Sequence, residues 1–363
     1  MRNTLWFGAV GLACVGGEAL AQERFPIEAS NDQMLRRRNR ISLKASFNFG
    51  IKTHFTSATV NGSGSFPRVG PENRTYDDGF VNIDISGNAG ATTWFWGYND
   101  NAQFTAADGT LAAPNTGASS LAFHSASSLA DGATRGSRDT MIPGFELAYE
   151  EVLGRWHISE KRRANIGILV TFGWMRLGQN DSAALAGPVT VTTDKYLTGA
   201  VLPPLAPYAG SFGAAGPLLP DAPVERAVGV FAGTGSVNNK LEGSLYGFNV
   251  GPFIELPLHD RVSLSLGGGL GFVYADTTYT FRETVVVPGV VTANRAGRIG
   301  RDEWLFSGIA RANLYVALNE AWSWEIGLAY QYAQSYRSSV AGKTANLQLD
   351  GIMTINTGLN YAF

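Results

Sequence analysis

Thiols are almost absent from this chain. Its one cysteine, Cys14, lies in an apolar run from Leu5 to Val15 that follows the basic start Met1-Arg2-Asn3. The small residues Ala19-Leu20-Ala21 end this run, and charge, apolar run and small residues in this order are typical of a cleavable export signal. We therefore predict a signal peptide at residues 1–21. Cleavage behind it leaves no thiol, which excludes disulfides and thiolate chemistry from the exported chain.

Long apolar runs and charges are scarce as well. Behind the signal, no stretch approaches the roughly 20 apolar residues of a membrane-crossing helix, and the mean hydropathy is −0.02. These features exclude a helical membrane protein. Charged residues make up 16% of the chain and the net charge is −2, which argues against a nucleic-acid partner. The four scattered histidines offer no ligand spacing, so we expect neither a metal nor a cofactor.

Glycine and aromatic residues are plentiful instead, with 44 Gly, 8 Trp, 13 Tyr and 20 Phe. From Leu347 to Phe363, apolar side chains occupy one parity and mostly polar or small ones the other. A period of two indicates a strand with one apolar face, here long enough to cross a membrane at a tilt. The same rhythm recurs in 262–274, 322–332 and 166–174. A soluble β-sandwich shares this composition, but it gives no reason for strands of such length.

Ten segments are predicted strands. They are 41–53, 77–86, 91–103, 143–158, 163–177, 241–257, 261–283, 301–318, 322–337 and 346–363. Tight turns and long connections alternate between them. An even strand number with this alternation predicts an all-β fold, a transmembrane up-and-down antiparallel β-barrel of about ten strands, with eight to twelve open. The barrel domain is expected to cover 41–363.

The connection 178–240 is the longest, and it holds seven of the 15 prolines. Proline cannot donate to a strand ladder, so we predict an exposed loop. Two extended pieces inside it, Val189–Tyr196 and Val224–Phe231, are expected to pair as a hairpin above the membrane. If they were wall strands, the barrel would have twelve.

The end of the chain carries a family resemblance. Leu359, Tyr361 and Phe363 place apolar residues at every second position and an aromatic residue last. This resembles the assembly signal of Gram-negative outer-membrane β-barrels, both porin-like and small structural ones. The resemblance implies export to the outer membrane, contact with its lipid and lipopolysaccharide, and recognition of the last strand by the barrel-assembly machinery. Residues 22–40, which end in a basic run, would then be a polar periplasmic leader.

Side-chain parity predicts a charged lumen and an aromatic girdle. The inward charges form the expected lumen network, in which Arg311 pairs with Glu325: Lys44, Asp84, Glu146, Glu150, Glu255, Arg311, Glu325 and Asp350. The tryptophans near predicted strand ends form the expected girdle at the membrane surfaces: Trp94, Trp96, Trp156, Trp174, Trp304, Trp322 and Trp324.

These features predict a monomeric structural wall protein or a narrow passive channel, with lumen charges that fill rather than open a barrel of this size. The alternative is a surface adhesion or ligand-binding barrel that uses loops 104–142 and 178–240. A third reading, an omptin-like barrel enzyme, would bring Asp77-Asp78 and His54 together at the outer rim. The sequence has no Asp-x-His element, so we assign no catalytic residues and expect no enzyme.

Overall fold

The computed structural model describes residues 38–57, 71–85, 90–105, 119–129, 135–137, 141–159, 162–199, 202–213 and 216–363. The predicted signal peptide and most of the predicted leader lie outside these ranges. Strands dominate the described residues, and the single helical segment among them is the 3-10 turn η1 (Asn101–Gln103). No helix in this part of the chain is long and apolar enough to span a membrane.

Eight strands close into a ring, in the order β10-β1-β20-β17-β16-β15-β14-β11, with β11 pairing back to β10. They are β1 (Asn39–Phe49), β10 (Ile142–Ser159), β11 (Arg162–Gly199), β14 (Glu225–His259), β15 (Val262–Val287), β16 (Val291–Ala317), β17 (Trp322–Ala333) and β20 (Ile352–Ala362). Each pairs antiparallel with the next along the chain, and β20 closes the ring on β1. The predicted all-β up-and-down barrel is confirmed.

The ring lies at the lower end of the predicted range of strand numbers. Segments 77–86 and 91–103 were predicted as wall strands, but they leave the ring and contribute to small separate sheets. Alternation of apolar and polar residues does not distinguish these segments from wall strands. Any strand with one buried face has this alternation, whether that face borders a lumen or packs on another sheet. At the other boundary, β1 begins at Asn39, so Arg40 belongs to the wall and not to the leader.

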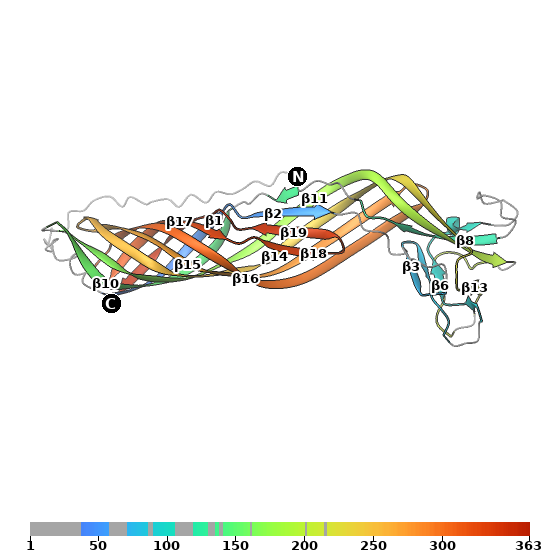
Figure 1. The fold of residues 1–363 in the computed structure, drawn as a ribbon, viewed down its shortest axis with the longest axis horizontal. Helices are drawn as coiled ribbons and strands as arrows, with labels where there is room; N and C mark the ends of the chain where they lie inside the picture. The colour runs from blue at the N-terminus through green and yellow to red at the C-terminus, as the bar shows by residue number, and fades with distance from the viewer. Residues whose placement is uncertain are drawn as a thin grey trace, which may run out of the picture.

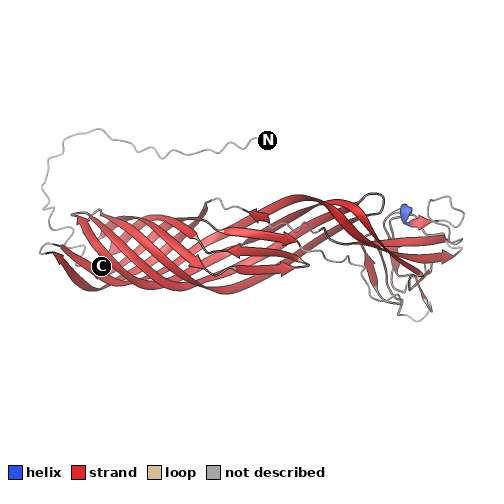
Figure 2. Ribbon diagram, turned by 45° about the horizontal axis from the view of Figure 1, so that its top comes forward, coloured by secondary structure: helices blue, strands red, loops and turns tan. Residues whose placement is uncertain are grey.

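Four wall strands continue far beyond the ring and form a stalk. The β11–β14 pairing runs unbroken in register from Asn165↔Glu255 to Lys195↔Glu225, and β15 and β16 extend beside it (Figures 1 and 2). Most of 178–240 is therefore strand, which corrects the predicted loop. The hairpin inside it is present, since Val189 pairs with Phe231. Pro188 is tolerated within β11, whereas Pro203, Pro204 and Pro207 lie outside β11 and β14.

A second sheet packs against the stalk and is called the inner sheet. Its order is β18-β19-β2-β9, from β18 (Tyr336–Val340), β19 (Lys343–Gln348), β2 (Lys52–Ser57) and β9 (Arg135–Ser137). One apolar core, the stalk core, joins the two layers and includes Phe55, Leu347, Leu241 and Tyr279. Gly50 makes the bend from β1 into β2 with φ +85°, and a Cβ there would lie 2.3 Å from the Gly351 carbonyl oxygen.

A small head lies at the far end of the stalk, opposite the C-terminus (Figure 1). Its elements are β3 (Arg74–Tyr76), β4 (Gly79–Val81), β5 (Thr92–Thr93), β6 (Trp96–Tyr98), β7 (Phe104–Thr105), β8 (Ser119–Ala126), β12 (Tyr208–Ala209) and β13 (Leu219–Pro220). The core of the head is aromatic, with Trp96, Tyr98 and Phe123 buried together. β8 pairs with the end of β11, which fixes the head to the stalk.

Candidate functional site

Charged side chains cross the lumen of the ring. Lys44 on β1 lies 2.7 Å from a Glu325 carboxylate oxygen and 3.2 Å from one of Glu146, and both Lys44 and Glu325 are fully buried. Arg311 donates two hydrogen bonds to Glu146, at 3.0 and 3.2 Å. Glu146 is on β10 and Arg311 on β16, which are opposite strands of the ring. These pairs therefore bridge the full width of the barrel.

A second layer of charges lies nearer the short turns. Arg40 donates to both carboxylate oxygens of Glu255, at 3.2 Å for its Nη1, and its Nε lies 3.4 Å from Glu150. The Tyr315 hydroxyl donates to Glu150 at 2.6 Å, again from β16 to β10 across the ring. Ser263 also donates to Glu255, at 2.6 Å. Each buried carboxylate thus has a cationic or hydroxyl partner, as burial of charge requires.

The predicted lumen network is only partly the observed one. Asp84 lies in the head after β4, and Asp350 lies exposed in the turn before β20, so neither faces the lumen. The ion pair of Arg311 is made with Glu146 and not with the predicted Glu325, which binds Lys44. Arg40 was missed because the predicted leader ended at that residue. Its position two residues before Ser42, on the inward parity of β1, was the available signal.

Glycine makes the Lys44–Glu325 pair geometrically accessible. In the ring, Gly358 of β20 lies in register between Lys44 of β1 and Glu325 of β17. A Cβ at Gly358 would lie 2.1 Å from the Leu43 carbonyl oxygen. The two charged chains therefore meet over a strand that presents no side chain at that level.

Above the charges the lumen narrows to a small cavity of about 40 Å³. The polar side chains of Asn48, Gln331 and Asn249 line it together with the apolar side chains of Leu245 and Val273. Its volume suits a few water molecules. Leu245 and Val273 belong to the stalk core, so the polar lumen ends against apolar packing. An eight-stranded ring is just wide enough for side chains to fill in this way.

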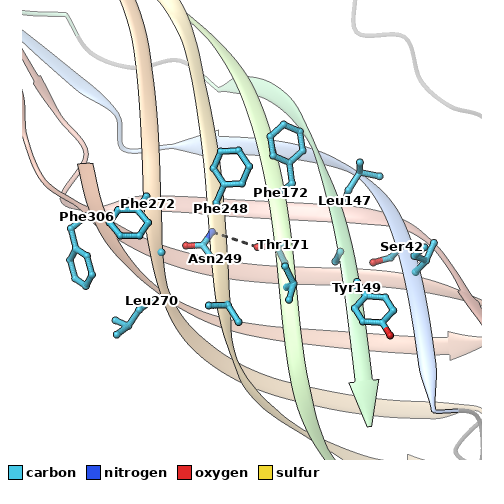
Figure 3. A pocket seen from close by; sticks show the side chains of 15 residues that line it. Ser42, Leu147, Tyr149, Thr171, Phe172, Phe248, Asn249, Leu270, Phe272 and Phe306 are labelled. Atoms are coloured by element: carbon cyan, nitrogen blue, oxygen red, sulfur yellow. Dashed lines mark hydrogen bonds between the residues drawn. The ribbon is translucent and has the colours of Figure 1, made fainter. Parts of the chain in front are cut away.

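The outer face of the ring is apolar, and a shallow hollow of about 590 Å³ lies on it. Phe172, Phe248, Phe272 and Phe306 project around this hollow from four neighbouring strands (Figure 3). Exposed Leu270 extends the apolar surface. Side chains of this kind on the outside of a closed ring are suited to hydrocarbon contact.

Two rows of aromatic side chains border this apolar belt. On the stalk side, Trp174, Tyr246, Tyr274 and Trp304 follow one another in register across β11, β14, β15 and β16. On the short-turn side, the exposed aromatics include Trp156, Trp322, Trp324, Tyr361 and Phe363. Of the predicted girdle residues, Trp94 and Trp96 lie instead in the head, where Trp96 is buried.

The residues of the third, omptin-like reading lie in different parts of the structure. His54 lies in the inner sheet, with its Nε2 3.0 Å from Gln348. Asp78 instead meets His124 of β8, with 2.6 Å between Oδ2 and Nδ1, and accepts the His124 backbone N–H at 2.8 Å. These bonds hold the β3–β4 turn against β8. Within the described ranges, no group of three or more His, Cys, Asp or Glu side chains is arranged to bind a metal.

Asp77 ties this turn to the stalk. Its carboxylate accepts the Ala126 N–H at 2.8 Å and lies 3.1 Å from the Arg295 guanidinium. Burial raises the pKa of Asp77, and this effect outweighs the opposing influence of the Ala126 N–H and the Arg295 charge.

A buried polar cluster lies where the head meets the stalk. The Tyr76 hydroxyl donates to Asp194 at 2.7 Å and lies 2.8 Å from the Tyr196 hydroxyl, while Arg226 donates to Asp194 at 2.6 Å. Burial raises the pKa of Tyr76, and Tyr196 and Asp194 add to this effect, so that the hydroxyl stays protonated as a donor. Arg226 is the second residue of β14, and the cluster fixes the start of that strand.

Comparisons with known proteins give only distant similarities. No protein-family model and no curated protein matches the chain. Among solved structures, the attachment invasion locus protein Ail of Yersinia pestis is 9% identical with a TM-score of 0.24, covering 89% of this chain and 99% of Ail. The outer membrane protease OmpT of Escherichia coli is 9% identical with a TM-score of 0.32, covering 90% and 97%. The outer membrane protein OprG of Pseudomonas aeruginosa is 8% identical with a TM-score of 0.24, covering 90% and 97%.

These similarities do not assign an activity, and the chain's own geometry is more informative. Strands are stable in lipid only where every backbone N–H and C=O group is hydrogen-bonded. A closed ring of strands has no free edge, so it meets this requirement. The ring of this chain also has even strand number, short turns at one end and aromatic rows on both sides of an apolar belt. The ring therefore has the architecture of a transmembrane β-barrel.

Proposed function

We propose that this protein is a surface-binding barrel, in which the ring is an anchor and the stalk presents the head to a partner outside the cell. The observation that carries the proposal is the continuity of β11 and β14 from the membrane wall to the head, in unbroken register. A loop would have sufficed to connect two wall strands. Because β11 and β14 stay paired up to the head, they hold a binding surface at a fixed distance from the membrane.

The filled lumen supports an anchor in preference to a passive channel. Arg311–Glu146 and Tyr315–Glu150 cross the ring, and the stalk core covers the lumen from above. Open aqueous channels occur in rings of about sixteen strands. The same geometry supports a binding role over a catalytic one, because the bonds recorded for Asp78 and His124 position backbone and do not activate a nucleophile.

The stalk is built to be stiff. The inner sheet covers it, and Lys343 of β19 makes a buried 2.7 Å ion pair with Glu283 of β15. Phe55 and Tyr279 stack across the same interface with 6.1 Å between ring centroids. A stiff support lowers the entropy lost when the head binds a partner.

Three further partners belong to this proposal. Outer-membrane lipid and lipopolysaccharide would cover the apolar belt and the aromatic row on its stalk side. The barrel-assembly machinery would read β20, whose Leu359 and Tyr361 project outward. Within one membrane the protein would be a monomer, since its ring is closed by its own strands.

The experiment compares adhesion of cells that display the wild-type protein, a head variant and a matched control. Trp96→Ala removes a fully buried side chain from the head core, a change that costs about 3–5 kcal/mol. Trp322→Ala changes an exposed ring at the opposite end. We expect Trp96→Ala alone to abolish adhesion, while both variants keep the gel-mobility shift of a folded barrel.

Planar-bilayer recordings complete the test. We expect no discrete conductance steps from the wild-type protein. Clear steps, together with adhesion that is unaffected by Trp96→Ala, would overturn the proposal in favour of a channel.

A further inference from the structure

The first part of β14 has one unpaired edge. β11 borders β14 from Glu225 to Glu255, but β15 joins the other side only from Thr234↔Val286 onward. Among the strands that the structure describes, residues 227–233 therefore have a strand neighbour on one side only. We call this segment the free edge. An edge strand presents backbone N–H and C=O groups that can pair with another strand.

The side chains of the free edge are apolar and exposed. Val228 and Val230 share one face and are 65% and 69% exposed, and Phe231 is 40% exposed on the other face. Residues 227–235 contain no charge and no proline. Natural edge strands are usually protected from pairing by lysine, proline or a bulge. Further along β14, the same outward face carries Lys240 and Glu242, so the free edge is where this protection is missing.

We propose that the free edge pairs antiparallel with the free edge of a second copy of this chain. The inference goes beyond the surface-binding function proposed above, because it adds a contact on the stalk beside the head. A two-fold axis through Gly229 pairs residues 227–231 with the same residues of the second copy. Val228 then faces Val230 of the second copy, and Ala227 faces Phe231. Four valines meet on one face, a favourable cross-strand arrangement.

The symmetry determines where the two copies are. A two-fold axis that makes the strands antiparallel also points the two stalks in opposite directions, so the two rings lie in two facing membranes. Residues 174–191 of β11 separate the aromatic row from the partner of Gly229 and span about 55 Å of strand, enough to carry the edge well clear of the lipid. Each contact is small, and many contacts between two membranes add through multivalency.

A charge swap tests the pairing in lipid vesicles that carry the full-length protein. Val228→Lys with Val230→Lys places like charges opposite each other in the proposed register, and Val228→Glu with Val230→Glu does the same with the opposite sign. Both sites are exposed, so the fold should tolerate them. We expect wild-type vesicles to aggregate, and each double variant to lower aggregation about tenfold, equivalent to about 1.4 kcal/mol. Mixing the lysine vesicles with the glutamate vesicles should restore it.

The matched control is Ser236→Lys with Asn238→Lys. These residues lie on the same strand and face, but in the part of β14 that is paired on both sides. We expect this variant to aggregate like wild type. Equal aggregation of the Val228/Val230 lysine variant and wild type would overturn the inference.

Disulfide formation tests the register, in a chain with Cys14→Ser. Directly opposite residues have Cα atoms close enough for a disulfide, whereas diagonal ones do not. Val228→Cys vesicles should therefore cross-link to Val230→Cys vesicles and not to themselves. Self-cross-linking of Val228→Cys alone would indicate parallel contact within one membrane and overturn the inference. If wild-type vesicles stay separate while displaying cells still adhere through the head, this inference fails and the proposed function stands.

Discussion

Replacing Lys44 with methionine would remove the cation that neutralises Glu325. The Lys44 ammonium lies 2.7 Å from Glu325 and 3.2 Å from Glu146. Glu146 keeps its two bonds to Arg311, so Glu325 is the carboxylate that loses its ion-pair partner. Both Lys44 and Glu325 are fully buried. Breaking a buried pair from one side costs about 3–5 kcal/mol, because the remaining charge has neither water nor a partner.

The assay is urea unfolding of the detergent-folded protein, followed by the mobility of the folded band. With a denaturant slope of about 2 kcal/mol per M, the loss would lower the midpoint by about 2 M. Lys44→Met with Glu325→Gln removes the unpaired charge and should recover most of that loss.

The control is Lys240→Met, which breaks the exposed 2.6 Å pair with Glu242 on the stalk surface. Pairs of this kind contribute at most about 1 kcal/mol. If Lys44→Met destabilised the protein no more than Lys240→Met does, the lumen charges would be hydrated and the argument for a filled lumen would be refuted.

Three further predictions concern the belt, the bend and the head. Leu270→Lys, between the two aromatic rows, should destabilise the folded protein in lipid by about 2–4 kcal/mol, whereas Thr284→Lys on the stalk part of β15 should have little effect on the same urea midpoint. Gly50→Ala should lower the free energy of unfolding by at least about 1–3 kcal/mol, because φ is +85° and the new Cβ meets a carbonyl oxygen; an unchanged urea midpoint for Gly50→Ala would disprove the strain. Because the pKa of Asp77 is raised above its usual 3.8, the folded head binds this proton more tightly than the unfolded head, so the stabilisation is complete below pH 3.8 and is lost as the pH rises through the raised pKa. In wild type, the resistance of the head to proteolysis should decrease as the pH rises through the raised pKa of Asp77. In Asp77→Asn, this resistance should change less over the same pH window. Identical pH profiles of the two proteins would contradict the raised pKa of Asp77.

The predictions from sequence succeeded in the wall of the ring, where alternate residues of each strand face only hydrocarbon or only the lumen. Leu359 and Tyr361 face outward as the alternation predicted, and Lys44 and Glu325 face inward, because hydrocarbon and lumen select opposite side chains at successive residues. The prediction of the charge partners was weaker. Arg311 binds Glu146 across the ring, and no local pattern relates residues on opposite strands of a barrel whose strand number is still open.

The alternation also failed to separate wall from stalk. Leu241 and Leu245 alternate as wall residues do, but they pack on the inner sheet above the lumen. Trp96 was assigned to a girdle and is buried in the head, because an aromatic side chain suits a membrane surface and a protein core equally well.

The amino-acid sequence alone determined the strand rhythm, the absence of helical spans and the apolar outer belt, since these depend only on which side chains alternate along a strand. The tertiary structure decided the number of strands in the ring, the partners of each lumen charge, and the stalk that lifts the head from the membrane. Those features depend on contacts between residues far apart in the chain, such as Arg311 with Glu146 and Lys343 with Glu283. Such contacts exist only after the ring has closed and the inner sheet has packed against the stalk.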